Sequence, residues 1–320
     1  MQRILILQPA FLGDVILATA LVEKLSVAYP QAEIDMLVRK GNEKVLLDHP
    51  KITKLHLFDR KRKWKSLWRL TSDIRARKYD LVVNVQRHFS SGLLTWLSGA
   101  KQKLGFRQNP FSWAFSKKVE HRWELHEVQR NQALIAHLTD EQAALPKLYP
   151  KAAARSFIEK LYPQPYITIS PASVWATKQL PLERWVAMLN KLPAQQRVYL
   201  LGGPNDAALC EELKSMTIHP SVLVLAGKHS FLEDAVLMQG ATMNYVLDSA
   251  PLHICSAMNA PTTAIFCSTA PQFGFGPLAE GAIILETKLD LDCRPCGKHG
   301  HKECPKGHFR CGEIAVPSSK

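Results

Sequence analysis

The chain has 320 residues, 46% of them hydrophobic, which is enough for two domains of ordinary size with a large apolar core. It contains no run of about 18 apolar residues, and the apolar run at 4–7 is shorter than the core of a signal peptide, so we expect a soluble cytoplasmic protein rather than a membrane-spanning or secreted one. The net charge of +13 is uneven, since residues 1–150 hold 25 Lys and Arg against 14 Asp and Glu while residues 151–320 hold 16 against 14, and the first half is therefore expected to face an anionic partner.

The first half alternates short apolar runs with helical patterns. The apolar runs predict strands at 4–7, 34–38 and 81–85, and the helical patterns predict helices at 15–28, 44–47 and 66–77. Alternation of this kind favours a parallel sheet with helices on both faces.

The second half repeats this scheme after a proline-rich linker at 145–165. Its apolar runs predict strands at 166–169, 198–201, 222–225, 244–247 and 262–266. Its helical patterns predict helices at 182–191, 206–216, 232–239 and 251–258. We therefore predict an α/β chain of two doubly wound, Rossmann-like domains, residues 1–150 and 151–290, that face a central cleft, followed by a cysteine-rich tail at 291–320. Ligands of such sheets bind beyond the carboxyl ends of the strands, so the loops at those ends are the candidate sites.

Asp14 stands in the first of these loops, after Gly13 and at the start of a helical pattern. A carboxylate there would repel a phosphate, so this turn does not read as a phosphate site. The local alternative is an N-cap, because Asp is a preferred capping residue. The functional interpretation is a general base, and the two are compatible because a carboxylate has two oxygens.

Three loops of the second half carry groups that suit a phosphorylated ligand. The loop after 166–169 holds Ser173 and Lys178, and hydroxyls with a cation fit a phosphate, although a plain surface loop is the alternative. The turn after 244–247 holds Asp248, Ser249 and His253 at a helix start, where free N–H groups bind anions. A core histidine is the alternative interpretation of His253.

Asp206 follows the pair Gly202-Gly203, which allows close backbone approach to a ligand. An acid at such a place can bond ribose hydroxyls, and it can equally be a helix cap.

Four segments in matching order and spacing resemble the ADP-heptose:lipopolysaccharide heptosyltransferase family, glycosyltransferase family 9, over nearly the whole chain: LGDVILATALVEKL, YDLVVNVQRHFSSGLLTWLSGAKQKLGF, SPASVWATKQLPLERWVAML and LDSAPLHICSAMNAPTTAIFCSTAP. The resemblance implies the GT-B architecture and an inverting reaction that needs no metal. It also implies an acceptor-binding first domain and a second domain that binds a nucleotide-sugar, with ADP-heptose as donor.

The resemblance carries roles onto individual residues. It makes Asp14 the catalytic base and Lys178 the residue that contacts the donor phosphates and stabilises the diphosphate leaving group. It adds Ser173 near those phosphates and matches Asp248, Ser249 and His253 to the family's Asp-Ser-Gly-x-x-His. Beside these we expect Gly13, Gln86, Arg87 and Asp206, in loops at strand ends, among the substrate-binding residues. Ala250 departs from the family, which mostly has Gly there, and its methyl group narrows the approach to a phosphate.

The charge distribution agrees with an acceptor built on phosphorylated lipopolysaccharide core. The run at 60–65, with Trp64, Trp68 and Arg69, fits a patch that contacts the anionic inner membrane surface. A solvated charged face is the alternative.

The tail holds four cysteines, Cys293, Cys296, Cys304 and Cys311. In a cytosolic chain such a cluster favours a metal over disulfides, and four thiolates suit a structural zinc or iron ion. Free buried cysteines or adventitious metal uptake are the alternatives. The other three, Cys210, Cys255 and Cys267, are expected in the core.

Two rival functions remain open at the level of the sequence. One is a GT-B enzyme with another nucleotide-sugar, either a transferase or an epimerase. The other is a nucleic-acid-binding protein with a basic domain and a metal tail, which would explain the charge and the cysteines but not the polar groups at matching strand ends. We therefore expect no nucleic-acid partner. The sequence does not identify the sugar, the acceptor hydroxyl or the oligomeric state.

Overall fold

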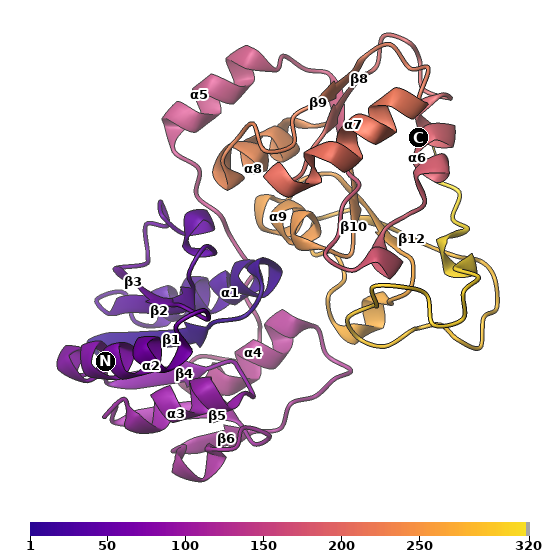
Figure 1. Cartoon of the computed structure of the whole chain (residues 1–320). Helices are drawn as coiled ribbons and strands as arrows, with labels where there is room; N and C mark the ends of the chain where they lie inside the picture. The colour runs from indigo at the N-terminus through magenta and orange to yellow at the C-terminus, as the bar shows by residue number, and fades with distance from the viewer. Residues whose placement is uncertain (318–320) are drawn as a thin grey trace. The chain divides into compact units, whose positions relative to one another are not determined.

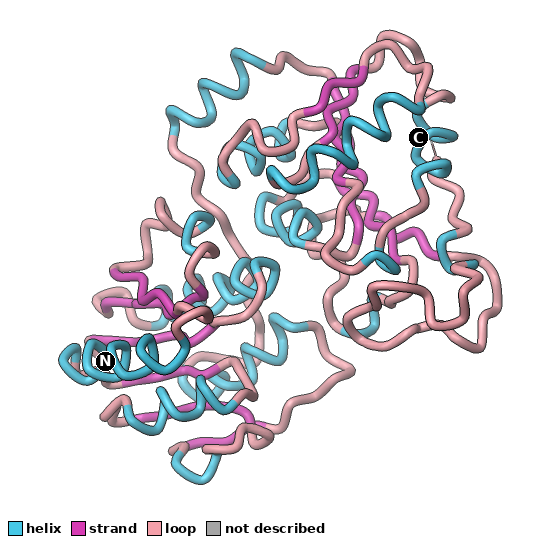
Figure 2. The backbone as a smooth tube through the Cα atoms, in the orientation of Figure 1, coloured by secondary structure: helices cyan, strands magenta, loops and turns pink. Residues whose placement is uncertain are grey.

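The computed structural model describes residues 1–317 and divides the chain into two compact units, Met1–Tyr149 and the segment from Pro150 onward (Figure 1). Each unit is a parallel six-stranded sheet with helices packed against it. Figure 2 shows the strands in magenta and the helices in cyan. None of the helices in the described residues is long and apolar enough to cross a membrane.

The N-terminal unit, residues 1–149, has the strand order β3-β2-β1-β4-β5-β6. Its strands are β1 (Arg3–Gln8), β2 (Glu33–Arg39), β3 (Lys54–Phe58), β4 (Leu81–Asn84), β5 (Gln102–Phe106) and β6 (Lys117–Val119). Its helices are α1 (Leu12–Ala28), α2 (Lys63–Arg77), α3 (Phe89–Leu97) and α4 (Glu127–Ile135). Helices α1 and α4 pack together, and so do α2 and α3. The central strands β1, β2 and β4 are apolar runs that the helices bury.

The C-terminal unit, residues 150–317, has the strand order β12-β11-β10-β7-β8-β9. Its strands are β7 (Tyr166–Ser170), β8 (Arg197–Leu200), β9 (Val222–Val224), β10 (Met243–Leu247), β11 (Thr262–Phe266) and β12 (Ile283–Glu286). Its helices are α5 (Ala152–Leu161), α6 (Leu182–Leu189), α7 (Ala207–Met216), α8 (Phe231–Gly240) and α9 (Ala250–Met258). Residues 287–317 add no further strand, only the short turn η7 (Arg310–Gly312).

Most of the predicted strands and helices are present, and two local predictions were wrong. The helix expected at 44–47 is a single 3-10 turn, η1 (Glu43–Val45), because a segment this short gains too few hydrogen bonds to propagate. The linker expected at 145–165 contains helix α5, whose Ile158 is buried. The predicted core cysteines Cys210, Cys255 and Cys267 are confirmed as fully buried.

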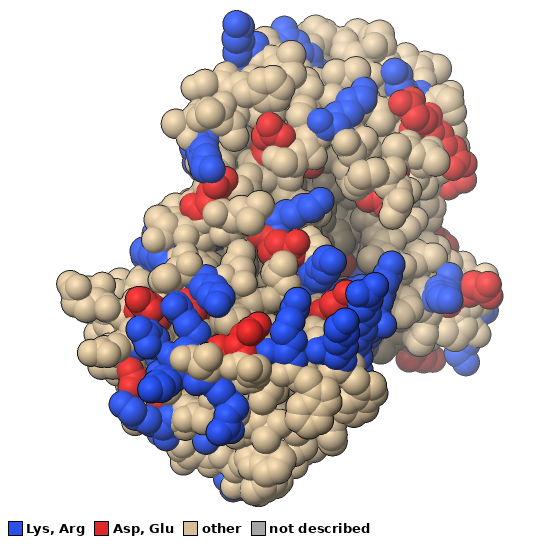
Figure 3. All heavy atoms as spheres, turned by 60° about the vertical axis from the view of Figure 1, so that its left-hand side comes forward, with Lys and Arg blue, Asp and Glu red and all other residues tan. Residues whose placement is uncertain are grey.

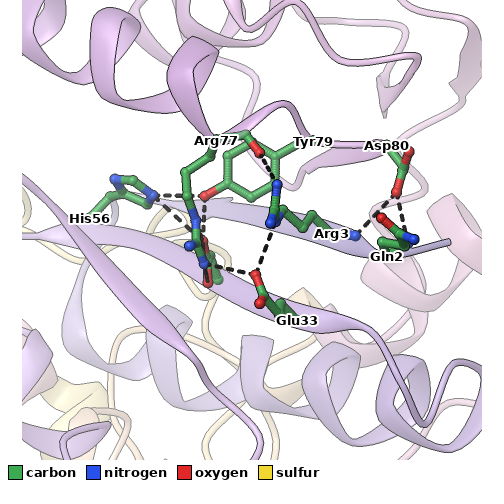
Figure 4. A network of polar contacts seen from close by, with 8 residues as sticks. Gln2, Arg3, Glu33, His56, Arg77, Tyr79 and Asp80 are labelled. Carbon is green, nitrogen blue, oxygen red and sulfur yellow. Dashed lines mark hydrogen bonds and ion pairs between the residues drawn. The ribbon is translucent and has the colours of Figure 1, made fainter.

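A polar network ties the amino ends of β1, β2 and β3 together, at the sheet edge opposite the predicted site (Figure 4). Asp35 of β2 is fully buried and accepts a hydrogen bond from the Arg77 guanidinium at 3.0 Å. Burial raises the pKa of Asp35, but hydrogen bonds from His56 and Tyr79 and the charge of Arg77 outweigh it and hold that pKa below its usual value. The network is therefore structural, since it gives the buried Asp35 carboxylate hydrogen bonds from Arg77 and Tyr79.

Candidate functional site

A buried ion pair lies at the carboxyl edge of the sheet in the C-terminal unit. Lys178 ends the 3-10 turn η4 (Ala176–Lys178), and Asp248 directly follows β10. The Lys178 Nζ lies 2.7 Å from Asp248 Oδ2, and the two side chains are 12% and 10% exposed. Thr269, beyond the end of β11, donates a second hydrogen bond to the same oxygen at 2.6 Å. The structure thus brings together two residues that the sequence pointed to in separate loops.

Two hydroxyls at the same edge of this sheet are buried without a partner. Ser249 is the N-cap of α9, yet its Oγ makes no capping hydrogen bond. The Oγ atoms of Ser249 and of Ser170, the last residue of β7, have no hydrogen-bond partner within residues 1–317. Buried polar atoms are rarely left unpaired, so these hydroxyls and the Ala250 N–H at the start of α9 are suited to bind an anion. Pro251 has no N–H, and the Leu252 N–H donates to the Ser249 carbonyl at 3.1 Å. His253, one turn into α9, is 4% exposed.

The other two predicted residues of this unit have local structural roles. Asp206 Oδ2 accepts a hydrogen bond from the Gly203 N–H at 2.8 Å, which is the capping alternative weighed from the sequence. Ser173 shapes its own turn, because its carbonyl accepts from the Gln179 side chain at 2.7 Å. Within the described part of the chain, no hydrogen bond joins Ser173 or Asp206 to the Lys178–Asp248 pair.

Asp14 lies at the carboxyl edge of the sheet in the N-terminal unit. Helix α1 begins at Leu12 and its N-cap is Phe11, so Asp14 is the third helical residue and the alternative that it is the N-cap was wrong. The helix begins earlier because the carboxylate reaches back, and Asp14 Oδ2 accepts the Phe11 N–H at 3.2 Å. One carboxylate oxygen therefore has a capping role.

Gln86 and Arg87 follow β4 at the same edge. The Gln86 amide donates to the Oε1 of Gln8, the buried last residue of β1, at 2.6 Å, and this bond joins two strand ends. The Arg87 guanidinium carbon lies 4.5 Å from the centre of the Trp123 ring, and the Arg130 guanidinium carbon lies 5.3 Å from it. Trp123 thus holds Arg87 in place by a cation–π contact.

Positive charges converge on this edge. Burial and the charges of Arg87 and Arg60 lower the pKa of His88, so both guanidinium charges act on this ring. Arg130 is neutralised by Glu127 at 3.0 Å, with side chains 1% and 8% exposed, and so it supports Trp123 rather than adding net charge. Sequence reasoning missed Trp123 and Arg130. Trp123 lies in the loop after edge strand β6 and Arg130 lies in helix α4, and the sequence predicted neither of these elements.

The four tail cysteines differ in their surroundings. Cys311 is buried, whereas Cys293, Cys296 and Cys304 are partly exposed. Cys293 Sγ lies 3.7 Å from His308 Nε2. Burial raises the pKa of Cys304, but the backbone N–H groups of residues 306–309 outweigh it and lower that pKa. In residues 1–317, no three His, Cys, Asp or Glu side chains are grouped so as to hold a metal ion, and the tail metal stays a prediction.

Several known proteins are similar to this chain over most of its length. Lipopolysaccharide heptosyltransferase 3 of Escherichia coli is 29% identical over 280 residues, which are 81% of this chain and 82% of that protein. A glycosyl transferase family 9 structure from Veillonella parvula superposes with a TM-score of 0.81 at 23% identity, covering 89% of this chain and 86% of the other. The structure of E. coli ADP-heptose lps heptosyltransferase II superposes with a TM-score of 0.78 at 20% identity, and the match covers 92% of this chain and 96% of the other. These two structures share the GT-B fold that the sequence predicted. The model of glycosyltransferase family 9 (heptosyltransferase) matches residues 67–307, and the chain therefore belongs to this family of enzymes.

Proposed function

We propose that this enzyme transfers a heptose from ADP-heptose to a hydroxyl of the lipopolysaccharide core. The observation that carries the proposal is the buried Lys178–Asp248 pair beside the unpartnered hydroxyls of Ser170 and Ser249. Asp248 takes one of the three donors of the Lys178 ammonium, and the remaining donors, the two hydroxyls and the start of α9 suit the oxygens of a nucleoside diphosphate. The names of the E. coli relatives, which specify lipopolysaccharide and ADP-heptose, support the sugar and the acceptor.

In the proposed reaction Asp14 takes the proton of the acceptor hydroxyl as its oxygen attacks the anomeric carbon of the donor. The bond from that carbon to the diphosphate oxygen breaks, and ADP leaves with the bonding electron pair. The new glycosidic bond forms on the opposite face of the sugar, so the configuration inverts. Lys178 stabilises the charge that grows on the diphosphate, and this lowers the transition state more than the ground state.

The N-terminal unit is proposed to bind the acceptor. Arg87, clamped on Trp123 beside His88 and Arg60, offers a positively charged, partly desolvated surface for phosphate or carboxylate groups. Arg suits this role because its planar fork binds two oxygens at once. Figure 3 shows Lys and Arg gathered over the N-terminal unit, in the lower half of the view.

We also propose that the N-terminal unit contacts an anionic membrane, since its acceptor is carried on a lipid. Trp64 and Trp68, on one face of α2, are 59% and 68% exposed and lie among the cations of residues 60–65. On the adjoining helix α3, Trp96 packs on Phe111 and Trp113, and the two tryptophans are 42% and 63% exposed. Exposed tryptophans with a basic surround fit the lipid–water interface. Sedimentation with vesicles of phosphatidylcholine, with and without phosphatidylglycerol, tests this contact.

A thermal-shift series with ADP, UDP, GDP and CDP tests the proposed donor site. ADP should raise the melting temperature of the wild-type protein more than the other three, because a ligand bound to the folded state stabilises it by mass action. Lys178→Ala should reduce that shift. A larger shift with another nucleoside diphosphate would assign a different donor, and steep, salt-sensitive binding to nucleic acid with no shift by any nucleotide would contradict a transferase site.

A further inference from the structure

The cysteine-rich tail is bonded to the loop that carries Lys178. The backbone of His301 contacts Thr177 in both directions, since its N–H donates to Thr177 Oγ1 at 2.8 Å and its carbonyl accepts from the Thr177 N–H at 3.1 Å. The Ser268 hydroxyl donates to the same Oγ1 at 3.0 Å, and Oγ1 donates to the His301 carbonyl at 3.2 Å. The one donor and two acceptor positions of this hydroxyl are thus all filled, and Thr177 is 4% exposed. The tail backbone therefore fixes the residue next to Lys178.

Gly300 brings the tail backbone against the Lys178 side chain itself. A Cβ on Gly300 would lie 3.1 Å from Lys178 Cγ and 3.3 Å from the Cβ of Trp175. Its φ is +74°, in the left-handed region that favours glycine. The tail backbone at Gly300 therefore packs closely against the aliphatic stem of Lys178. Figure 1 shows the tail as the yellow end of the chain.

Arg294, between Cys293 and Cys296, bonds the chain around the end of β11, next to the Thr269 that donates to Asp248. Its Nε donates to the Cys267 carbonyl at 2.7 Å, and its Nη2 donates to the carbonyls of Phe266 at 3.2 Å and Thr269 at 2.8 Å. It also pairs with Glu286 of β12, and its side chain is 14% exposed. The guanidinium thus fixes the end of β11, where Thr269 donates to Asp248.

A further hydrogen bond joins the tail to the segment after β11, because the Ser268 carbonyl accepts from the Cys296 N–H at 2.7 Å. Two routes therefore run from the tail to the ion pair. One passes through His301 and Thr177 to Lys178, and the other passes through Arg294 and Thr269 to Asp248. Both routes use bonds to a buried partner, so neither depends on contacts that water can replace easily.

We propose that the tail is a positioning element for the Lys178–Asp248 pair, with Thr177 and Arg294 as its positioning residues. The proposal rests on the role given to Lys178 in the proposed function. A lysine has four rotatable bonds, and stabilisation of a leaving group requires its charge to be held in one place. Misplacement by about 1 Å can cost roughly a hundredfold in rate, so loosening the tail lowers turnover while the fold persists.

The test compares variants that remove hydrogen-bonding groups and keep the side chain close to its original size. Thr177→Val removes the hydroxyl, Thr177→Ser keeps it, and Thr217→Val is the matched control, since the Thr217 hydroxyl bonds Asn190 elsewhere in the same unit. Arg294→Lys removes the fork of donors, and its control is Arg310→Lys, a tail residue that is 52% exposed.

We expect Thr177→Val and Arg294→Lys to lower kcat by about tenfold or more, with a smaller change in the KM for the donor, while Thr177→Ser and both controls stay near the wild type. Amide hydrogen exchange of residues 173–178 should become faster in the two impaired variants, and this readout does not depend on catalysis. Wild-type kcat and exchange in both folded variants would overturn the proposal, as would equal losses in Thr177→Ser or the controls. Failure of the role of Lys178 would show separately, as an active Lys178→Ala enzyme.

Discussion

Replacement of Asp14 by Asn separates the two roles that its carboxylate is given. The Asn side chain keeps an oxygen that can accept the Phe11 N–H, which Asp14 Oδ2 accepts at 3.2 Å. The lost negative charge in the first turn of α1 is worth about 0.3–1 kcal/mol, so the melting temperature should fall by no more than about 2–4 °C. An amide cannot take up the acceptor proton, and the transfer rate should therefore fall by about a hundredfold or more.

Glu233→Gln is the matched control for this variant. Glu233 is also the third residue of its helix, α8, and its Oε2 accepts the Ser230 N–H at 2.7 Å. The change therefore removes the same charge from the same kind of cap in the other unit. Initial rates of transfer and melting curves are measured for both variants. A folded Asp14→Asn enzyme with the wild-type rate would refute the general base and leave Asp14 as a cap only.

Three further predictions concern the donor site, the pH dependence of stability and the tail. Lys178→Ala should weaken ADP binding and lower kcat, measured by calorimetry and initial rates; if neither changes, Lys178 does not bind the donor. Burial lowers the pKa of His49 to about 4, against the opposing charge of Glu23, so the stability that depends on its neutral ring is present above pH 6.5 and is lost as the pH falls toward 4. The free energy of unfolding measured in urea should fall by about 2 kcal/mol between pH 7 and pH 5 because of this group, and it should fall by less in His49→Gln. An equal fall in both proteins would contradict the assignment. Elemental analysis of protein purified without a tag should find about one zinc or iron per chain, which a tail without stoichiometric metal would disprove.

The sequence predicted the elements whose own residues determine their structure. The apolar runs at 4–7 and 34–38 became β1 and β2, because strands buried on both faces read as continuous hydrophobic segments. Strand β3 was missed, because its run Lys54–Phe58 includes Lys and His56, and His56 is buried only through its bond to Tyr79 at 2.8 Å. That partner is distant in the chain, so no local pattern reveals it. Edge strand β6, three residues long with two exposed lysines, gives no apolar signal either.

The candidate site shows the same limit. Lys178, Asp248 and Ser249 could be named because each follows a strand that reads clearly. Their pairing could not be predicted, since it depends on β7 and β10 being neighbours in the sheet. The positioning role that we propose for Arg294 could not be found at all, because it depends on three backbone carbonyls that only the folded chain brings together.

Direct analysis of the transfer product tests the central claim most directly. The purified enzyme is incubated with ADP-heptose and a lipopolysaccharide core acceptor, and the product is analysed by mass spectrometry and by NMR of its anomeric proton. We predict an acceptor heavier by one heptose, with release of ADP and the opposite anomeric configuration from that of the donor. No product with ADP-heptose, together with transfer from another nucleotide-sugar, would contradict the proposed donor, and retention of configuration would contradict direct attack assisted by Asp14.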